Sequence, residues 1–119
     1  MQRVQVEPDN ILLEKNLKNR HVLVTGAGGS IGQEICKQIL KYKPKELILL
    51  DNNEYSLYSI NAQVEKIKLN LKHCKDVKIL PILGSVQDKF FIHNVMKKFK
   101  PDTVYYAAAF KHVPLVELN

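Results

Sequence analysis

A glycine-rich segment between a strand-like run and a helix-like run constrains the fold of this chain more than any other feature. It reads Thr25-Gly26-Ala27-Gly28-Gly29-Ser30-Ile31-Gly32, follows the β-branched run His21–Thr25, and opens a stretch whose isoleucines are spaced four apart. Strand, glycine turn and helix in this order form the context of a dinucleotide-binding fingerprint. Glycines at the turn let the backbone approach a diphosphate, and we expect Gly32 to let the helix pack close against the first strand. The free amides and dipole of the helix start favour the negative charge of the diphosphate.

An acidic residue completes this fingerprint. Asp51 ends the apolar run Glu46–Asp51, 19 residues after Gly32 (51 − 32). A carboxylate at that point accepts hydrogen bonds from an adenosine ribose and repels a 2′-phosphate. No arginine follows among residues 52–54, so we predict NAD rather than NADP and include Asn52 in the cofactor site. The alternative is a merely structural glycine turn, with Asp51 as a solvated strand end.

Alternating hydrophobic periods predict strands separated by helices along the rest of the chain. The predicted strands are His21–Thr25, Glu46–Asp51, Val77–Leu83 and Thr103–Ala108. The predicted helices are Ser30–Tyr42, a stretch around the apolar stripe Leu57–Leu71, and a third helix with Phe91 to Phe99 facing inward. Short connections between such elements favour right-handed crossovers. We therefore predict an α/β fold, a Rossmann-type parallel sheet of four strands in the order 3-2-1-4, with helices on both faces. It would be the start of a doubly wound fold.

Three local features refine this prediction. Pro81 removes a backbone donor from the third strand, which places that strand at a sheet edge. Ser85 and Asp88 have the spacing of a capping box before the third helix. Residues 1–20 are polar and read as an arm or linker with a short helical piece around Ile11–Leu17, and residues 21–119 read as the first part of the NAD-binding domain.

The charge and the cysteines of the chain limit the ligands and the cellular compartment that we expect for it. The formal charge is +6, with lysines clustered at 37–45 and 66–78; these form either a surface for anionic ligands or solvated helix ends. Without interleaved aromatic residues or arginines, the clusters do not indicate nucleic-acid binding. Cys36 and Cys74 form no disulfide framework and have no metal-ligand spacing, so we expect a cytoplasmic protein and no metal site. No apolar run is long enough to span a bilayer.

The glycine pattern at 26, 29 and 32 resembles that of the extended short-chain dehydrogenase/reductase superfamily. The segment Ala107-Ala108-Ala109-Phe110-Lys111-His112-Val113-Pro114 narrows the resemblance. It is similar to a segment of nucleotide-sugar 4,6-dehydratases of the bacterial polysaccharide-biosynthesis group, which includes UDP-N-acetylglucosamine 4,6-dehydratases. The run Leu49–Glu54 resembles the same group, and the polar arm is similar to the cytosolic lead-in of its long members, which are anchored in the inner membrane.

The resemblance implies roles for individual residues. The cofactor diphosphate would lie against Gly26, Gly29, Ser30 and Ile31, with Gly28 in the same turn. Ala107, Ala108 and Ala109 would line the ribose and nicotinamide. Lys111 and His112 would lie near a UDP-sugar, and self-association into homo-oligomers is expected. The run Gly84-Ser85-Val86 departs from the family's Gly-Asp-Val or Gly-Asp-Ile, so Ser85 either addresses the adenine, with Val86 beside it, or only caps the helix.

The resemblance also implies a reaction that these residues do not complete. In the family, hydride is removed from the sugar C4, water is eliminated from C5 and C6, and hydride is returned to C6. The superfamily's Tyr-x-x-x-Lys pair is absent, because no tyrosine here is followed by a lysine four places later. We therefore assign no catalytic residue and expect the chain to be the first part of a longer enzyme. The alternatives are a stand-alone NAD- or nucleotide-binding module and a fragment of a nucleotide-sugar 4-epimerase.

This interpretation predicts that the chain alone does not dehydrate a UDP-sugar. Incubation of the pure chain with NAD and UDP-N-acetylglucosamine, followed by chromatography of the sugar nucleotide, should return the substrate unchanged. Product formation above a blank without protein would contradict the assignment of a cofactor-binding part without catalytic residues.

Overall fold

Four parallel strands form the centre of the molecule. The computed structural model describes residues 4–5, 14–107 and 115–117. The strands are β2 (His21–Thr25), β3 (Glu46–Asp51), β4 (Lys78–Leu83) and β5 (Thr103–Tyr106), arranged in the order β4-β3-β2-β5. In chain order this is 3-2-1-4, so the predicted strand order is confirmed. Strand β4, which contains Pro81, lies at an edge as predicted.

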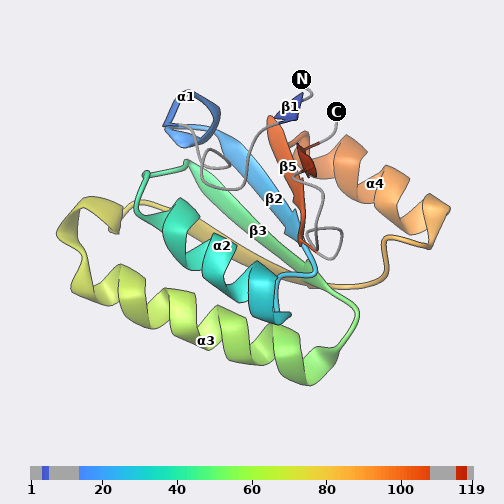
Figure 1. Ribbon diagram of the computed structural model, residues 1–119, viewed down its shortest axis with the longest axis horizontal. Helices are drawn as coiled ribbons and strands as arrows, with labels where there is room; N and C mark the ends of the chain where they lie inside the picture. The colour runs from blue at the N-terminus through green and yellow to red at the C-terminus, as the bar shows by residue number, and fades with distance from the viewer. Residues whose placement is uncertain (1–3, 6–13, 108–114, 118–119) are drawn as a thin grey trace.

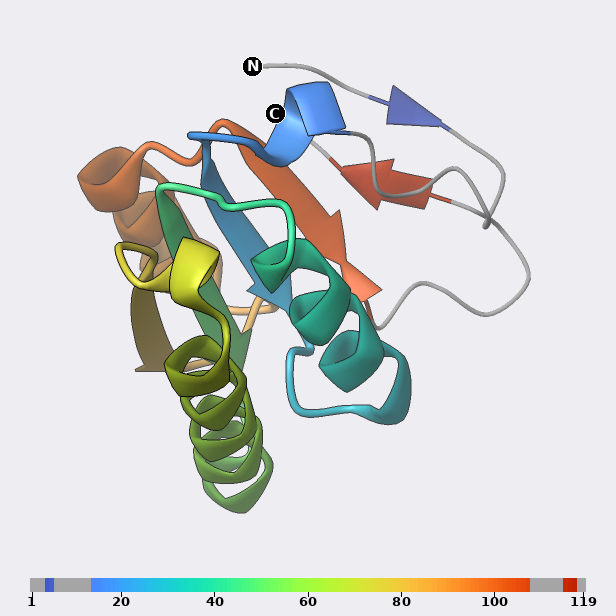
Figure 2. The same cartoon turned by 90° about the vertical axis from the view of Figure 1, so that its left-hand side faces the viewer.

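Helices cover both faces of this sheet (Figures 1 and 2). Helices α2 (Ser30–Leu40) and α3 (Glu54–Asn70) lie on one face, and α4 (Lys89–Phe99) lies on the other. Successive residues of β2 point to opposite faces: Val22 and Val24 pack in the core on the α2–α3 face, while Leu23 packs with α4. Strands buried on both faces must be apolar at every position, which explains the continuous apolar run of β3.

The predicted apolar stripes of the helices face the sheet. In α3, Leu57, Ile60 and Val64 are buried and Ile67 packs against them. In α4, Val95 is buried, and Phe91, Ile92, Met96 and Phe99 pack around it on the opposite face. These contacts confirm the helical periods expected from the sequence.

The start of α4 differs from the prediction. Its N-cap residue is Asp88, whose Oδ1 accepts a hydrogen bond from the amide of Phe91 at 3.0 Å. The Ser85 hydroxyl instead accepts from the amide of Gln87 at 3.1 Å, inside the preceding turn. The predicted capping box and the role of Ser85 as a helix cap are therefore wrong. The acidic residue itself is the cap, because a carboxylate at that position satisfies a free amide directly.

The segment before β2 contributes to the core. Helix α1 (Glu14–Leu17) places the side chain of Leu17 in the core on the α2–α3 face, with no exposed surface. The Thr103 hydroxyl donates to the carbonyl of Asn16 at 2.7 Å, which joins this segment to the start of β5.

Strands β1 (Val4–Gln5) and β6 (Leu115–Glu117) pair antiparallel in a separate sheet. A short 3₁₀ helix, η2 (Lys72–Cys74), precedes β4.

The burial of Leu17 predicts that the segment before β2 stabilises the domain. Leu17→Ala removes a fully buried side chain and should lower the free energy of unfolding by about 2–5 kcal/mol. Denaturant unfolding followed by circular dichroism measures this change. Lys18→Ala, at the exposed neighbouring position, serves as the control and should change stability little. Equal stability of both variants would show that residues 14–20 do not belong to the folded core.

Candidate cofactor site

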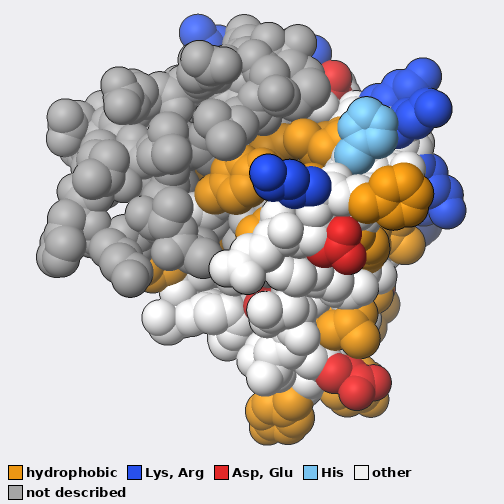
Figure 3. Space-filling model, turned by 90° about the vertical axis from the view of Figure 1, so that its right-hand side faces the viewer, with side chains coloured by type: hydrophobic (Ala, Val, Ile, Leu, Met, Phe, Trp, Pro, Cys, Tyr) orange, Lys and Arg blue, Asp and Glu red, His pale blue; other side chains and the backbone are white. Residues whose placement is uncertain are grey.

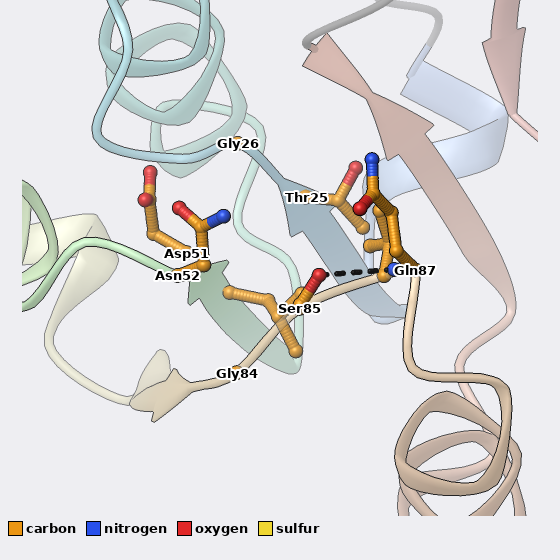
Figure 4. Close-up of a pocket in the computed structure, with 9 residues that line it drawn as sticks. Thr25, Gly26, Asp51, Asn52, Gly84, Ser85 and Gln87 are labelled. Carbon is orange, nitrogen blue, oxygen red and sulfur yellow. Dashed lines mark hydrogen bonds between the residues drawn. The ribbon is translucent and has the colours of Figure 1, made fainter.

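A pocket opens at the carboxyl ends of β2, β3 and β4 (Figure 4). Parallel sheets bind ligands at this edge, in the crevice outside the strand ends. The pocket brings together five of the residues predicted from the sequence, namely Gly26, Asp51, Asn52, Ser85 and Val86. Thr25, Leu50, Gly84 and Gln87 also line it and were missing from the predicted set. Adjacency to the fingerprint could have indicated Thr25, Leu50 and Gly84, but no motif pointed to Gln87.

The glycine loop turns tightly at Gly26. This residue has a positive φ of 69°, and its carbonyl accepts a hydrogen bond from the amide of Gly29 at 3.1 Å. A β-carbon at Gly32 would lie 1.9 Å from the same carbonyl oxygen. The close approach that Gly32 allows is therefore between the first turn of α2 and the end of β2. Only a residue without a side chain fits at this contact.

Gly28 is held on three sides. Its amide donates to Asp51 Oδ2 at 2.8 Å, and its carbonyl accepts from the Gln33 side-chain amide at 2.8 Å. A β-carbon on Gly28 would lie 2.6 Å from the backbone carbonyl of Ser56, in the first turn of α3. The loop is therefore fixed by β3, α2 and α3 together.

A chain of side-chain amides extends this support into α3. Gln63 Nε2 donates to Gln33 Oε1 at 3.3 Å and to the Ser59 hydroxyl at 3.1 Å. Gln33 in turn donates to the loop carbonyl of Gly28. Neither glutamine was predictable from the sequence, because their role depends on the packing of α2 against α3.

The first turn of α2 presents unoccupied backbone donors. Gly29 is the N-cap residue and provides no side chain to cap the helix, and Gly29, Ser30 and Ile31 are exposed. The first amides of an α-helix have no partner within the helix. Together with the helix dipole, such a helix start stabilises an anion.

Asp51 lies at the end of β3, beside this loop (Figure 4). Its Oδ2 accepts from the Gly28 amide, and its Oδ1 accepts from the Asn53 amide at 2.9 Å. An ionised carboxylate has about four acceptor positions, so two remain for a ligand. Asp51 can therefore hold the loop and accept hydroxyl donors at the same time.

The lysines gather at the opposite edge of the sheet. The segments that lead into the four strands carry most of the exposed cations of the described chain, at positions 15, 18, 20, 41, 43, 45, 72, 75, 78, 97, 98 and 100. The segments that leave β2, β3 and β4, residues 26–29, 52–53 and 84–88, contain no lysine or arginine. Lysines at the helix ends complement the helix dipoles. No lysine of these clusters lies among the residues that line the pocket.

The predicted residues near the end of β5 are only partly described. Ala107 is buried beside the core, whereas Ala108, Ala109, Lys111 and His112 lie outside the described residues. Tyr106 ends β5 beside Thr25, and desolvation raises the pKa of its hydroxyl, which keeps it protonated at neutral pH.

The described residues hold no group of three His, Cys, Asp or Glu that could bind a metal. None of their helices is long and apolar enough to cross a membrane.

Comparison with known proteins identifies the family. Residues 22–119 match the family described as polysaccharide biosynthesis protein. The chain belongs to this family. It is 47% identical to the capsular polysaccharide biosynthesis protein CapD of Staphylococcus aureus. The match covers 98% of this chain and 19% of the length of CapD. It is 32% identical to the UDP-N-acetylglucosamine 4,6-dehydratase (inverting) of Campylobacter jejuni (strain 81-176), over 84% of the chain and 27% of the enzyme. The chain thus spans about a fifth to a quarter of these relatives.

Comparison with solved structures supports the Rossmann-type fold described above. An NAD⁺-bound xylitol dehydrogenase superposes with a TM-score of 0.54 at 24% identity, over 71% of this chain and 30% of the enzyme. A short-chain type dehydrogenase/reductase from Mycobacterium ulcerans gives a TM-score of 0.59 at 15% identity, over 71% and 29%. This family member therefore has the Rossmann-type fold of short-chain dehydrogenases, as predicted from the resemblance.

The environments of the glycines predict different tolerances within one loop. Gly28→Ala forces a β-carbon against the backbone of Ser56 and should destabilise the chain by about 2–3 kcal/mol. Gly29→Ala places its β-carbon 3.5 Å from the Gly26 carbonyl, an ordinary contact, and should cost less than about 1 kcal/mol. Thermal unfolding of both variants measures the difference. Equal destabilisation would show that α3 does not press against the loop.

Proposed function

We propose that this chain is the cofactor-binding part of an NAD-dependent nucleotide-sugar 4,6-dehydratase in bacterial polysaccharide biosynthesis. The observation that carries the proposal is the position of Asp51. Its carboxylate lies beside the glycine loop and the uncapped start of α2, and it has acceptor positions left for a ligand. The family and the dehydratase of C. jejuni support the reaction class. The substrate would be a UDP-sugar. The parent enzyme would lie in the cytoplasm, either free or attached to the inner membrane by an anchor.

The residues of the pocket fit the adenosine end of NAD. The diphosphate would lie against Gly29, Ser30 and Ile31 and accept from the amides of Ser30 and Ile31, since the Gly29 amide already donates to the Gly26 carbonyl. The ribose hydroxyls would donate to Asp51. A 2′-phosphate would meet the Asp51 carboxylate, with no lysine or arginine among the pocket residues to neutralise it. This charge pattern favours NAD over NADP.

The adenine ring would lie between Asn52 and the segment Gly84–Gln87. Ser85 stands where the family has an aspartate, and its hydroxyl accepts from the Gln87 amide. The Gln87 side chain lines the same pocket and offers both a donor and an acceptor to a purine edge. Val86, at 38% exposure, provides an apolar surface for one face of the ring.

The rest of the reaction depends on residues beyond the pocket. Bound NAD would supply reversible hydride transfer to and from the sugar. Ala107, Ala108 and Ala109 would allow the nicotinamide ring to lie close to the end of β5, because they have the smallest side chains that a strand end can carry. Lys111 and His112 are the proposed contacts to the diphosphate of the nucleotide sugar, with Lys111 acting as a point charge.

The proposal predicts NAD binding with at least a tenfold preference over NADP, equivalent to about 1.4 kcal/mol. Isothermal titration calorimetry of the folded chain with each dinucleotide measures the preference. Asp51→Asn should weaken NAD binding and reduce the preference, since the amide no longer repels a 2′-phosphate. Asp76→Asn, an exposed aspartate at the opposite edge of the sheet, serves as the matched control and should behave like the parent chain. If the folded chain bound neither dinucleotide, the proposed site would be wrong.

A further inference from the structure

Helix α3 exposes a second set of apolar side chains, interrupted by Lys66, on the face turned away from the sheet; we call this set the stripe. Tyr55, Tyr58 and Leu69 are exposed to 82%, 75% and 85%, and Ala62 is also exposed. These positions are spaced three, four and seven apart, which aligns them along one side of a helix. The other side of α3, with Leu57, Ile60 and Val64, already packs on the core. Figure 3 shows hydrophobic side chains exposed at its lower end, where α3 begins.

We propose that this stripe is an interface with a second copy of the chain, in which the two α3 helices pair antiparallel about a two-fold axis at Ala62. Tyr55 and Leu69 each lie seven residues from Ala62, and Tyr58 and Lys66 each lie four residues from it. An antiparallel pair therefore places Tyr55 against Leu69 of the second copy, and Ala62 against itself. The small central side chain lets the two helices approach closely.

Charge favours this arrangement. Helix α3 has Glu54 in its first turn and Lys68 in its last turn. Antiparallel pairing brings the acidic turn of one copy beside the basic turn of the other, whereas parallel pairing would bring like charges together. It also sets Tyr58 opposite Lys66 of the second copy, where the lysine stem covers the ring and its ammonium group lies near the ring face. The surface is thus complementary to itself, as a two-fold interface requires.

The size of the contact sets the expected affinity. A helix of 17 residues is about 25 Å long, so a single helix pair lies at the small end of specific interfaces, below ~1,200 Å² in total. We expect a weak dimer at micromolar concentration. Tyrosine is enriched in protein interfaces relative to the rest of the surface, which agrees with the two tyrosines on the stripe. The inference is independent of cofactor binding, because the stripe does not line the pocket.

Disulfide trapping tests the predicted register. Ala62→Cys should form a covalent dimer on mild oxidation, because the axis places the two introduced thiols together. Tyr55→Cys and Leu69→Cys should each cross-link poorly alone and efficiently when the two variants are mixed. Cys36 and Cys74 are buried, and burial raises the pKa of both thiols, so the parent chain provides a low background. Asn94→Cys, exposed on α4, is the control for random collisions.

Two cross-linking results would overturn the proposed antiparallel interface. A dimer yield for Ala62→Cys no higher than for Asn94→Cys would overturn it, as would efficient cross-linking of Tyr55→Cys with itself, which indicates parallel pairing. Sedimentation equilibrium provides an independent measurement. Tyr58→Ser should weaken association at least tenfold, whereas Phe90→Ser, at a comparably exposed aromatic residue on α4, should not. Circular dichroism verifies that each variant is folded. A chain that stays monomeric at every concentration tested would also refute the interface.

Discussion

The hydrogen bond between the Gly28 amide and Asp51 connects the parts on which the rest of the site depends. It joins the loop after β2 to the end of β3, while the Gln33 side chain donates to the carbonyl of Gly28 and Ser56 occupies the space that a β-carbon on Gly28 would need. The loop conformation is thereby determined by β3, α2 and α3, of which β3 and α3 are distant from the loop in sequence. A loop fixed in this way presents the start of α2 to a ligand without ordering the backbone at the moment of binding, which reduces the entropic cost.

The distribution of charge follows from the same architecture. In a parallel sheet covered by helices, the strand ends and helix starts gather at one edge, and the helix ends gather at the other. Lysines in the last turns and following loops complement the negative helix ends, so they accumulate opposite the pocket. The net charge of +6 therefore says little about the ligand, and the pocket residues include no lysine or arginine.

Local sequence patterns predicted most of the fold. Strands His21–Thr25 and Glu46–Asp51, the edge position of the strand with Pro81 and the inward stripes of α3 and α4 agree with the structure. The start of α4 was mispredicted, because Ser85 and Asp88 are both good caps and only the path of the turn selects between them. Five of the nine pocket residues were predicted: Gly26, Asp51 and Asn52 from the fingerprint, and Ser85 and Val86 from the family resemblance. Gln87 and the Gln33–Gln63 pair were not, since nothing local marks a glutamine as a ligand or a support.

Hydrophobic patterns and local motifs were enough to predict the fold class, the family and the point where the chain turns from strand to helix at a glycine loop. These properties depend on hydrophobic period and on glycines that allow a tight turn, both of which are local. The different demands on Gly28 and Gly29 became visible only in the folded chain. A β-carbon on Gly28 would collide with Ser56, whereas one on Gly29 would make an ordinary contact with the Gly26 carbonyl. The fold also leaves Tyr55, Tyr58 and Leu69 of α3 exposed. These properties were not predictable, because contacts between distant segments depend on how whole elements pack.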